Sequence, residues 1–161
     1  MMNENRTKAL AYTLVVTGDE ILSGKRKDRH IPLINSALIQ RGMECVRCAI
    51  VGDNDSSLTA VLKQALQESA VVIVTGGLGP TLDDITRESL SDATSIPLYE
   101  SPGALAELQE RFRQIGRPMS DNNRRQALVP EKGFYFSNPN GTAPGLVYDL
   151  QDRVAVALPG P

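Results

Sequence analysis

Three short runs of consecutive apolar residues, separated by segments of helical pattern, constrain the fold of this chain more than any other feature. The runs lie within Ala11–Thr17, Val46–Val51 and Val71–Thr75. Because each run is apolar at successive positions, and not only at alternate ones, it predicts a strand buried on both faces. Strands of this kind, alternating with helices, are typical of a parallel sheet with helices packed on both sides.

The segments between the strands carry the signals expected of helices. The strongest helical spacing follows the second strand, at Leu58, Val61, Leu62, Ala65 and Leu66. We expect Ser56 or Ser57 to cap that helix. We expect Asp28 to cap an earlier helix that begins near Pro32. Further helices are expected near Ile85–Ala93, over the segment from Leu105 to Ile115, and briefly at Asp121–Ala127.

The pattern changes after Pro130 to short strands separated by Gly, Pro and Asn turns. These strands are expected at Phe134–Phe136, Leu146–Leu150 and Val154–Leu158. The last two are joined by only three residues, which predicts a hairpin. The sequence therefore predicts an α/β fold with a mostly parallel central sheet, helices on both of its faces and an antiparallel edge hairpin.

Length and composition narrow the class of protein. The chain has 161 residues, so we expect one domain over residues 11–161 after a polar, flexible tail over residues 1–10. Its C-terminus falls where a further helix would be usual, which indicates a sequence cut from a longer one. A net charge of −2, with 4% aromatic residues and no Trp, argues against nucleic-acid binding.

The sequence also gives an expectation about location. The longest apolar run is far shorter than the roughly 20 residues that span a bilayer, and the polar start is no secretory signal. Two cysteines make no disulfide scaffold. We therefore expect a cytoplasmic protein that does not bind membranes.

The segment after the third strand is the sharpest candidate site. Thr75 is followed by Gly76, Gly77 and Gly79, then by Asp83 and Asp84 at the start of a predicted helix. Glycines allow the backbone N–H groups to approach a ligand, and a helix N-terminus favours anions, so phosphate is the expected ligand. Two carboxylates would repel phosphate unless a divalent metal bridges them or they contact another part of the ligand. The alternative is a glycine-rich turn with Asp84 as a helix N-cap.

Two other strand ends carry similar residues, namely Gly18, Asp19 and Glu20 after the first strand and Gly52 and Asp53 after the second. In open parallel sheets ligands bind outside the carboxyl ends of the strands, so all three sets should share one rim. The loop Asn138–Gly145 could add backbone N–H groups and the Thr142 hydroxyl. Each of these segments, taken alone, is also consistent with an ordinary turn.

Three other features have plainer interpretations. Cys45 and Cys48 are three residues apart in a predicted strand, so their side chains should point to opposite faces and cannot form a disulfide. His30, the single histidine, is expected to be a surface or capping residue. Arg124 and Arg125 could bind an anion or form a solvated face, and the sequence favours neither.

Taken in order, several of these motifs resemble one known family. They are Gly18–Gly24, Val51–Asp53, Thr75–Thr81, Asp83–Thr86, Asn122–Ala127, Asn140–Gly145 and Leu158–Pro161. They look like the molybdopterin-binding (MoaB/Mog-like) domain, and most of all like the N-terminal domain of the competence/damage-inducible protein A (CinA) family. The resemblance covers nearly the whole chain. Two departures concern the ligand: Leu78 stands where the molybdopterin branch usually has Thr, and Lys27–His30 replaces an Asn-Thr-Asn-like run of longer CinA proteins.

The resemblance implies a three-layer α/β sandwich, often trimeric, with a pocket at the strand carboxyl ends. It implies that the loop at Gly76, Gly77 and Gly79 holds a phosphate. It also implies that Asp53 and Asp84 are the functional carboxylates, which assist nucleotidyl transfer with magnesium in the adenylating relatives. In the CinA branch the same domain is associated with pyrophosphate cleavage in ADP-ribose.

Two functions follow as hypotheses. One is a module that binds a phosphate-bearing pterin or nucleotide, and the alternative is a pyrophosphate hydrolase with Mg²⁺ held by Asp19, Asp53 and Asp84. An interaction domain without a ligand is a third, which the polar loops disfavour. The expected ligand-binding residues are Gly18, Asp19, Glu20, Thr75, Gly76, Gly77, Gly79, Asp83, Gly141, Thr142 and Pro144. A homo-oligomer, either trimer or dimer, is expected.

Overall fold

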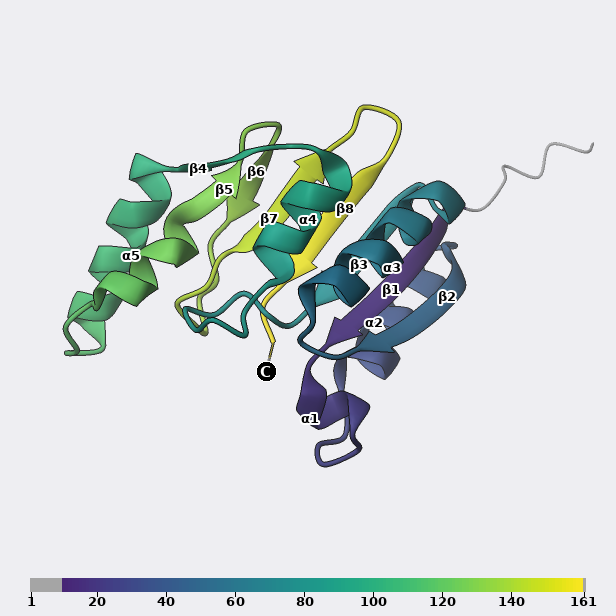
Figure 1. Ribbon diagram of the computed structural model, residues 1–161, viewed down its shortest axis with the longest axis horizontal. Helices are drawn as coiled ribbons and strands as arrows, with labels where there is room; N and C mark the ends of the chain where they lie inside the picture. The colour runs from purple at the N-terminus through teal and green to yellow at the C-terminus, as the bar shows by residue number, and fades with distance from the viewer. Residues whose placement is uncertain (1–9, 161) are drawn as a thin grey trace, which may run out of the picture.

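The computed structural model describes residues 10–160, and its centre is a six-stranded sheet with strand order β2-β1-β3-β8-β7-β6 (Figure 1). The strands are β1 (Ala11–Thr17), β2 (Glu44–Val51), β3 (Val71–Thr75), β6 (Gly133–Phe136), β7 (Gly145–Asp149) and β8 (Val154–Leu158). β2, β1, β3 and β8 are parallel, whereas β7 and β6 run antiparallel to their neighbours. The predicted mostly parallel sheet with an antiparallel edge is confirmed.

The three N-terminal strands are parallel neighbours, as predicted. β1 and β3 have the predicted bounds, and β2 begins two residues earlier, at Glu44. The expectation that β2 is buried on both faces is wrong, because β2 lies at the edge of the sheet. Val46 and Ile50 are 45% and 40% exposed there. The hairpin of β7 and β8 is confirmed, with β7 one residue earlier than predicted.

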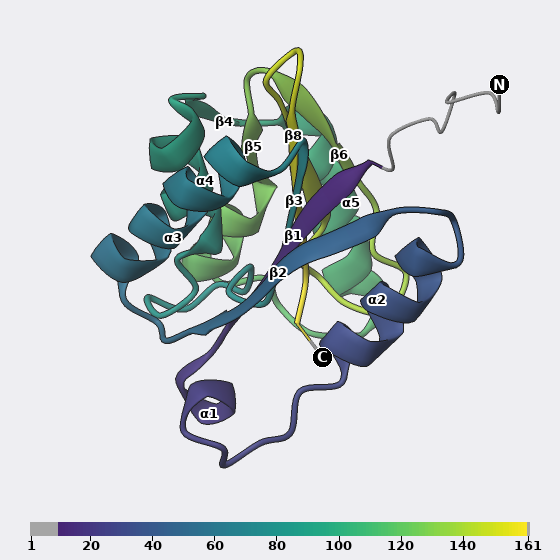
Figure 2. The same ribbon diagram turned by 90° about the vertical axis from the view of Figure 1, so that its right-hand side faces the viewer.

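Helices cover both faces of this sheet (Figure 2). α2 (His30–Ile39) packs on one face, where Ile31, Ile34 and Leu38 contact a cluster around Tyr12 and Leu14. α3 (Asp55–Glu68) and α4 (Thr86–Thr94) lie on the other face. Three of the predicted core residues of α3, Leu58, Leu62 and Leu66, are buried, and Val61 is half-buried. The remaining elements are α1 (Asp19–Leu22), β4 (Leu98–Glu100), α5 (Pro102–Gln114), the 3-10 helix η1 (Asp121–Ala127) and β5 (Leu128–Pro130).

Two helix starts differ in detail from the prediction. Asn54, and not Ser56 or Ser57, caps α3, because its side-chain oxygen accepts the N–H of Ser57 at 3.0 Å. Asp28 does accept the N–H groups of His30 and Ile31, so α2 begins at His30, two residues before Pro32. The tail expected over residues 1–10 lies, apart from residue 10, outside the described residues.

A β-bulge in β2 overturns the prediction for the two cysteines. Tyr12 pairs with Cys45 but Thr13 pairs with Arg47, so Val46 is an extra residue without a partner in β1. An extra residue shifts the alternation of side chains, and Cys48 therefore falls on the same face as Cys45. Their Sγ atoms are 3.6 Å apart.

Candidate functional site

A cavity of about 870 Å³ lies at the carboxyl ends of β1, β3 and β8. It is lined by both predicted catalytic carboxylates, Asp53 and Asp84, and by most of the predicted ligand-binding residues: Gly18, Glu20, Thr75, Gly76, Gly77, Gly79, Asp83, Gly141 and Thr142. Asp19 is not among its lining residues, and Pro144 lines a second cavity of about 580 Å³ between α5 and the segment after β6. The strand ends of a parallel sheet meet at one edge, which is why segments far apart in sequence converge here.

The glycine loop, Gly76–Gly79, turns its carbonyl groups away from solvent. Gly76 and Gly77 have positive φ values of 103° and 63°, a region that side chains rarely allow. The Thr86 hydroxyl donates to the Gly76 carbonyl at 2.8 Å, and the Thr86 N–H donates to the Gly77 carbonyl at 3.1 Å. Among residues 10–160, no acceptor is paired with the N–H groups of Gly77, Leu78 and Gly79. The loop therefore has free donors and occupied acceptors.

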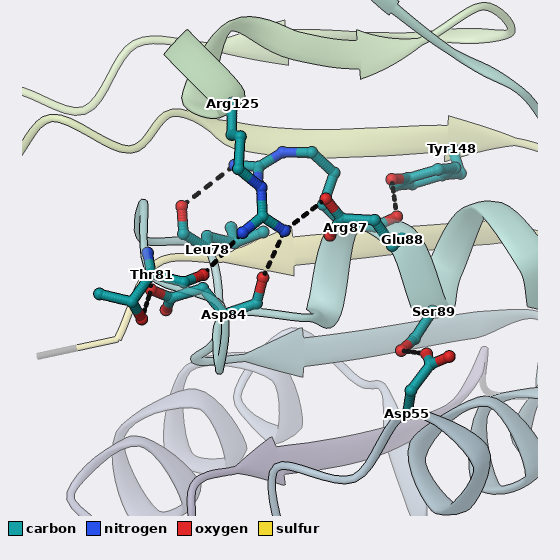
Figure 3. A network of polar contacts seen from close by, with 9 residues as sticks. All are labelled: Asp55, Leu78, Thr81, Asp84, Arg87, Glu88, Ser89, Arg125 and Tyr148. Carbon is teal, nitrogen blue, oxygen red and sulfur yellow. Dashed lines mark hydrogen bonds and ion pairs between the residues drawn. The ribbon is translucent and has the colours of Figure 1, made fainter. Parts of the chain in front are cut away.

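A buried arginine holds this loop from behind (Figure 3). Arg87 is fully buried in α4, and its guanidinium donates to the Leu78 carbonyl at 3.0 Å. Tyr148 in turn donates its hydroxyl to the Arg87 carbonyl at 2.9 Å. Burial lowers the pKa of Arg87, and the nearby Glu88 carboxylate opposes that shift. Nε and Nη1 of Arg87 have no partner in the described part of the chain. A cation without a neutralising contact thus lies behind the loop.

Arg125 fixes the next turn of the same wall. Its guanidinium donates to the Thr81 carbonyl and to the Glu88 carboxylate, each at 2.8 Å. Arg124 points elsewhere and forms an exposed ion pair with Glu100. Of these two arginines, Arg125 braces the candidate site by its backbone contacts, and Arg124 does not.

The two predicted catalytic carboxylates are engaged in the wall itself. Asp53 accepts hydrogen bonds from the Thr17 hydroxyl and the Asp19 N–H, and the Asp19 carboxylate accepts the N–H of Asp53. Asp84 accepts the N–H and the hydroxyl of Thr81, at 2.9 and 2.6 Å. The alternative of Asp84 as an N-cap is wrong, because α4 begins after Ile85 without a side-chain cap.

Within residues 10–160, no three His, Cys, Asp or Glu side chains gather closely enough to hold a metal ion. The carboxylates of Asp19, Asp53 and Asp84 therefore do not form a three-ligand group of this kind. The magnesium site and the catalytic role of Asp53 and Asp84 stay predictions.

Another part of the cavity lining is a basic segment, Arg26–His30, which connects α1 to α2. Arg26, Lys27 and Arg29 line the cavity and form no ion pair with any described carboxylate. His30, predicted to be a surface or capping residue, lines the cavity as well, and its Nδ1 contacts the Thr75 hydroxyl at the end of β3. The basic segment therefore adjoins the residue from which the glycine loop starts.

The comparison with protein families agrees with this site. Residues 13–161 match the family described as "probable molybdopterin binding domain". The chain belongs to this family. A protein of Symbiobacterium thermophilum described as competence-damage inducible is 44% identical over 149 residues, which are 92% of this chain and 35% of that protein. A CinA-like protein of Gloeothece citriformis is 38% identical over 94% of this chain and 36% of its own length.

The molybdopterin-binding domain formed by this chain thus spans about a third of the length of these curated relatives. Among solved structures, a CinA protein of unknown function from Thermoplasma acidophilum aligns with a TM-score of 0.87 and 28% identity, over 94% of this chain and 88% of that one. The tungsten cofactor synthesizing protein MoaB from Pyrococcus furiosus aligns with a TM-score of 0.59 at 22% identity, over 96% and 84%. The second similarity concerns the fold alone. The resemblance seen in the sequence, to the MoaB/Mog-like domain and the CinA family, is confirmed.

Two contributors to the site were missed by the sequence interpretation. Arg87 is a single charged residue in a short polar helix, and nothing in its neighbours marks it as buried. His30 stands in a run of charged residues that is typical of a solvated loop. One signal could have suggested that His30 lies near the carboxyl ends of the strands. His30 belongs to the connection that follows the first strand, four residues after Arg26.

Proposed function

We propose that this molybdopterin-binding domain binds a small phosphate-bearing molecule, a pterin or a nucleotide, at the carboxyl ends of its strands. The observation that carries the proposal is the glycine loop. The N–H groups of Gly77, Leu78 and Gly79 have no described acceptor, the carbonyls of the loop are tied back, and the buried Arg87 lies behind it. Free N–H groups with a nearby positive charge are what a phosphate requires.

The remainder of the cavity supports a ligand larger than phosphate. A volume of about 870 Å³ lies within the usual range of small-molecule sites. Arg26, Lys27 and Arg29 provide positive charge beside the glycine loop, while the carboxylates of Asp53 and Asp84 are engaged by hydrogen bonds of the wall. The family to which the chain belongs favours a pterin-type ligand.

No observation favours the hydrolase alternative. A hydrolase of this kind needs a metal ion to neutralise the bridging phosphates and to activate water. Asp53 and Asp84 line one cavity, but among residues 10–160 they belong to no group of three potential metal ligands. Binding is the function that we propose, and the hydrolase stays the alternative to be tested. We also propose that the protein assembles as a dimer or trimer, which light scattering tests. A cytoplasmic location is proposed as well. No helix within residues 10–160 has both the length and the apolar character needed to cross a bilayer.

Calorimetric titration tests the binding proposal, with inorganic phosphate, AMP, ADP-ribose and a pterin phosphate as probes, each with and without Mg²⁺. We expect Gly77→Val to abolish binding, because a Cβ at position 77 would overlap the Thr86 hydroxyl and the residue would keep a positive φ. Gly116→Val is the matched control, since Gly116 has a similar φ of 67° but an open surrounding at the end of α5. The proposed anion site would be contradicted if both variants lost binding to the same extent, or if neither variant lost binding.

The substitution Asp84→Asn separates a binding module from an enzyme. An amide oxygen can still accept from Thr81, so we expect the melting temperature to change little. Loss of the negative charge should tighten binding of a phosphate-bearing probe. If the wild-type protein instead cleaves ADP-ribose with Mg²⁺, and the variant loses about 10²–10³ in turnover, the hydrolase alternative is correct.

A further inference from the structure

The two cysteines of the chain lie together on the edge strand β2, away from the cavity. Cys45 pairs with Tyr12 and Cys48 with Leu14, and these two β1 residues are on the same face of the sheet. This is the face that α2 covers. The bulge at Val46 produces this arrangement, because without an extra residue two positions three apart would lie on opposite faces.

The distance between the sulfur atoms fits a shared ion better than a disulfide. The Sγ atoms are 3.6 Å apart, whereas a disulfide requires about 2.05 Å. Two thiolates that bind one metal ion at about 2.3 Å in a tetrahedral arrangement lie about 3.8 Å from each other, and the longer bonds of Cd²⁺ or the wider angle at Cu⁺ increase that separation. The two sulfurs are therefore close enough to share one ion after a small outward movement.

The surroundings leave the two sulfurs accessible and poor in competing charge. Cys48 is exposed and Cys45 is half-buried, so an ion can enter from solvent. Asn35 of α2 reaches Cys48 Sγ with its amide nitrogen at 3.6 Å, and its oxygen accepts the Tyr12 hydroxyl at 2.7 Å. Arg47, between the cysteines, is paired with Glu68 at 2.9 Å. No cation of the described residues is therefore committed to the sulfurs.

We propose that Cys45 and Cys48 form a two-thiolate site for one soft metal ion of the Cu⁺ or Cd²⁺ class. Thiolate ligands select soft ions. A structural zinc site needs further ligands, and within residues 10–160 no third His, Cys, Asp or Glu joins the two cysteines. Binding forms two metal–sulfur bonds and releases the two thiol protons to solvent. No electron is transferred, so neither an oxidant nor a reductant is needed.

The acid–base properties of Cys45 mean that a bound ion must displace a thiol proton. Burial, and next the hydrogen bond with Cys48, raises the pKa of Cys45. Two adjacent negative sulfurs are unfavourable without a counter-charge, and a bound cation supplies one. The site is independent of the proposed phosphate ligand, because neither cysteine lines the cavity.

Anaerobic titration of the reduced protein with Cd²⁺, and with Cu⁺ against a chromophoric chelator, tests the proposal. We expect one ion per chain, together with the ultraviolet band of a metal–thiolate bond. Cys45→Ser and Cys48→Ser should each weaken binding by about a hundredfold or more, because one of two ligands is lost. Cys48 is exposed, so its substitution should leave the circular dichroism spectrum unchanged.

A double variant controls for the number of thiols. Cys48→Ala with Ala49→Cys keeps two cysteines but moves one to the opposite face of β2. We expect it to bind as weakly as the single variants. Binding equal to that of the wild type would overturn the proposal, as would a wild-type affinity no higher than that of Cys48→Ser. One ion per two chains would also overturn it, because the ligands would then come from different molecules.

Discussion

The glycine loop and the basic segment line the same cavity, but they are held in different ways. The glycine loop is fixed from inside the protein, by the buried Arg87, by Thr86 and, one turn further, by Arg125. The basic segment is fixed mainly at its end, where the Asp28 carboxylate accepts the N–H groups of His30 and Ile31, and where His30 contacts Thr75. Its three cations make no ion pairs with described residues.

Because of this difference, substitutions in the two regions should affect the stability of the folded protein differently. A substitution behind the glycine loop leaves buried polar groups without partners, so it affects stability and binding together. A substitution in the basic segment removes a charge exposed to solvent, so it affects binding alone. The run Lys27–His30, one of the two departures noted in the sequence, lies in the basic segment, and we expect this segment to influence the choice of ligand.

The largest expected effect is that of Arg87→Ala. The substitution leaves a void in the protein interior and removes the donor to the Leu78 carbonyl, so the free energy of unfolding should fall by about 3 kcal/mol or more. Urea denaturation measures it. Arg113→Ala removes an exposed ion pair with Glu110 in α5 and should change stability by about 0.5 kcal/mol or less. Equal stability of Arg87→Ala and the wild type would show that the guanidinium does not hold the wall.

An intermediate effect, confined to binding, is expected in the basic segment. The double variant Lys27→Ala with Arg29→Ala should keep the wild-type melting temperature. It should bind whichever phosphate probe the wild type binds about tenfold more weakly, and with less salt dependence. Lys25→Ala is the control, because Lys25 is exposed next to this segment but does not line the cavity. A similar loss in the control would mean that only overall charge matters.

The smallest expected effect concerns Tyr148. Its hydroxyl donates to the Arg87 carbonyl, so Tyr148→Phe should lower stability by about 1 kcal/mol. Burial raises the pKa of Tyr148. Above about pH 10 the unfolded chain therefore loses this proton while the folded chain keeps it, and stability falls as pH rises. The variant should show a shallower fall between pH 9 and roughly 11, as measured by urea denaturation at each pH. An unchanged slope would assign the alkaline loss to other groups.

The strands were predictable because their signal is local. β1 and β3 consist of consecutive apolar residues ended by glycine or threonine, and their bounds could be predicted to the residue. The three-residue strands β4 and β5 could not, since strands this short carry too few positions for a pattern and depend on their pairing with each other. The rim of carboxylates and glycines was predictable from topology, because parallel strands end at one edge of the sheet.

The parts of the site that escaped prediction depend on long-range packing. Arg87 is buried because α4 packs against the main core, and a single arginine in sequence gives no hint of that. The positions of Asp53 and Asp84 were predicted, but their hydrogen bonds to Thr17 and Thr81 follow from loop geometry. The cysteines were misplaced because a bulge has no reliable sequence pattern, and one extra residue reverses the face of every side chain beyond it.

The bulge in β2 also changes what the outer edge of the sheet offers to another chain. An unpaired edge strand presents regularly spaced N–H and C=O groups, which a strand of a second molecule can extend. At β2 this edge coincides with exposed apolar side chains, Val46 and Ile50, a combination that promotes aggregation. The extra residue, Val46, breaks the spacing near the start of the strand and increases its twist, which disfavours pairing of a second strand along the full length of β2. The irregularity that brings the two thiols together thereby also protects the domain from intermolecular sheet growth at this edge.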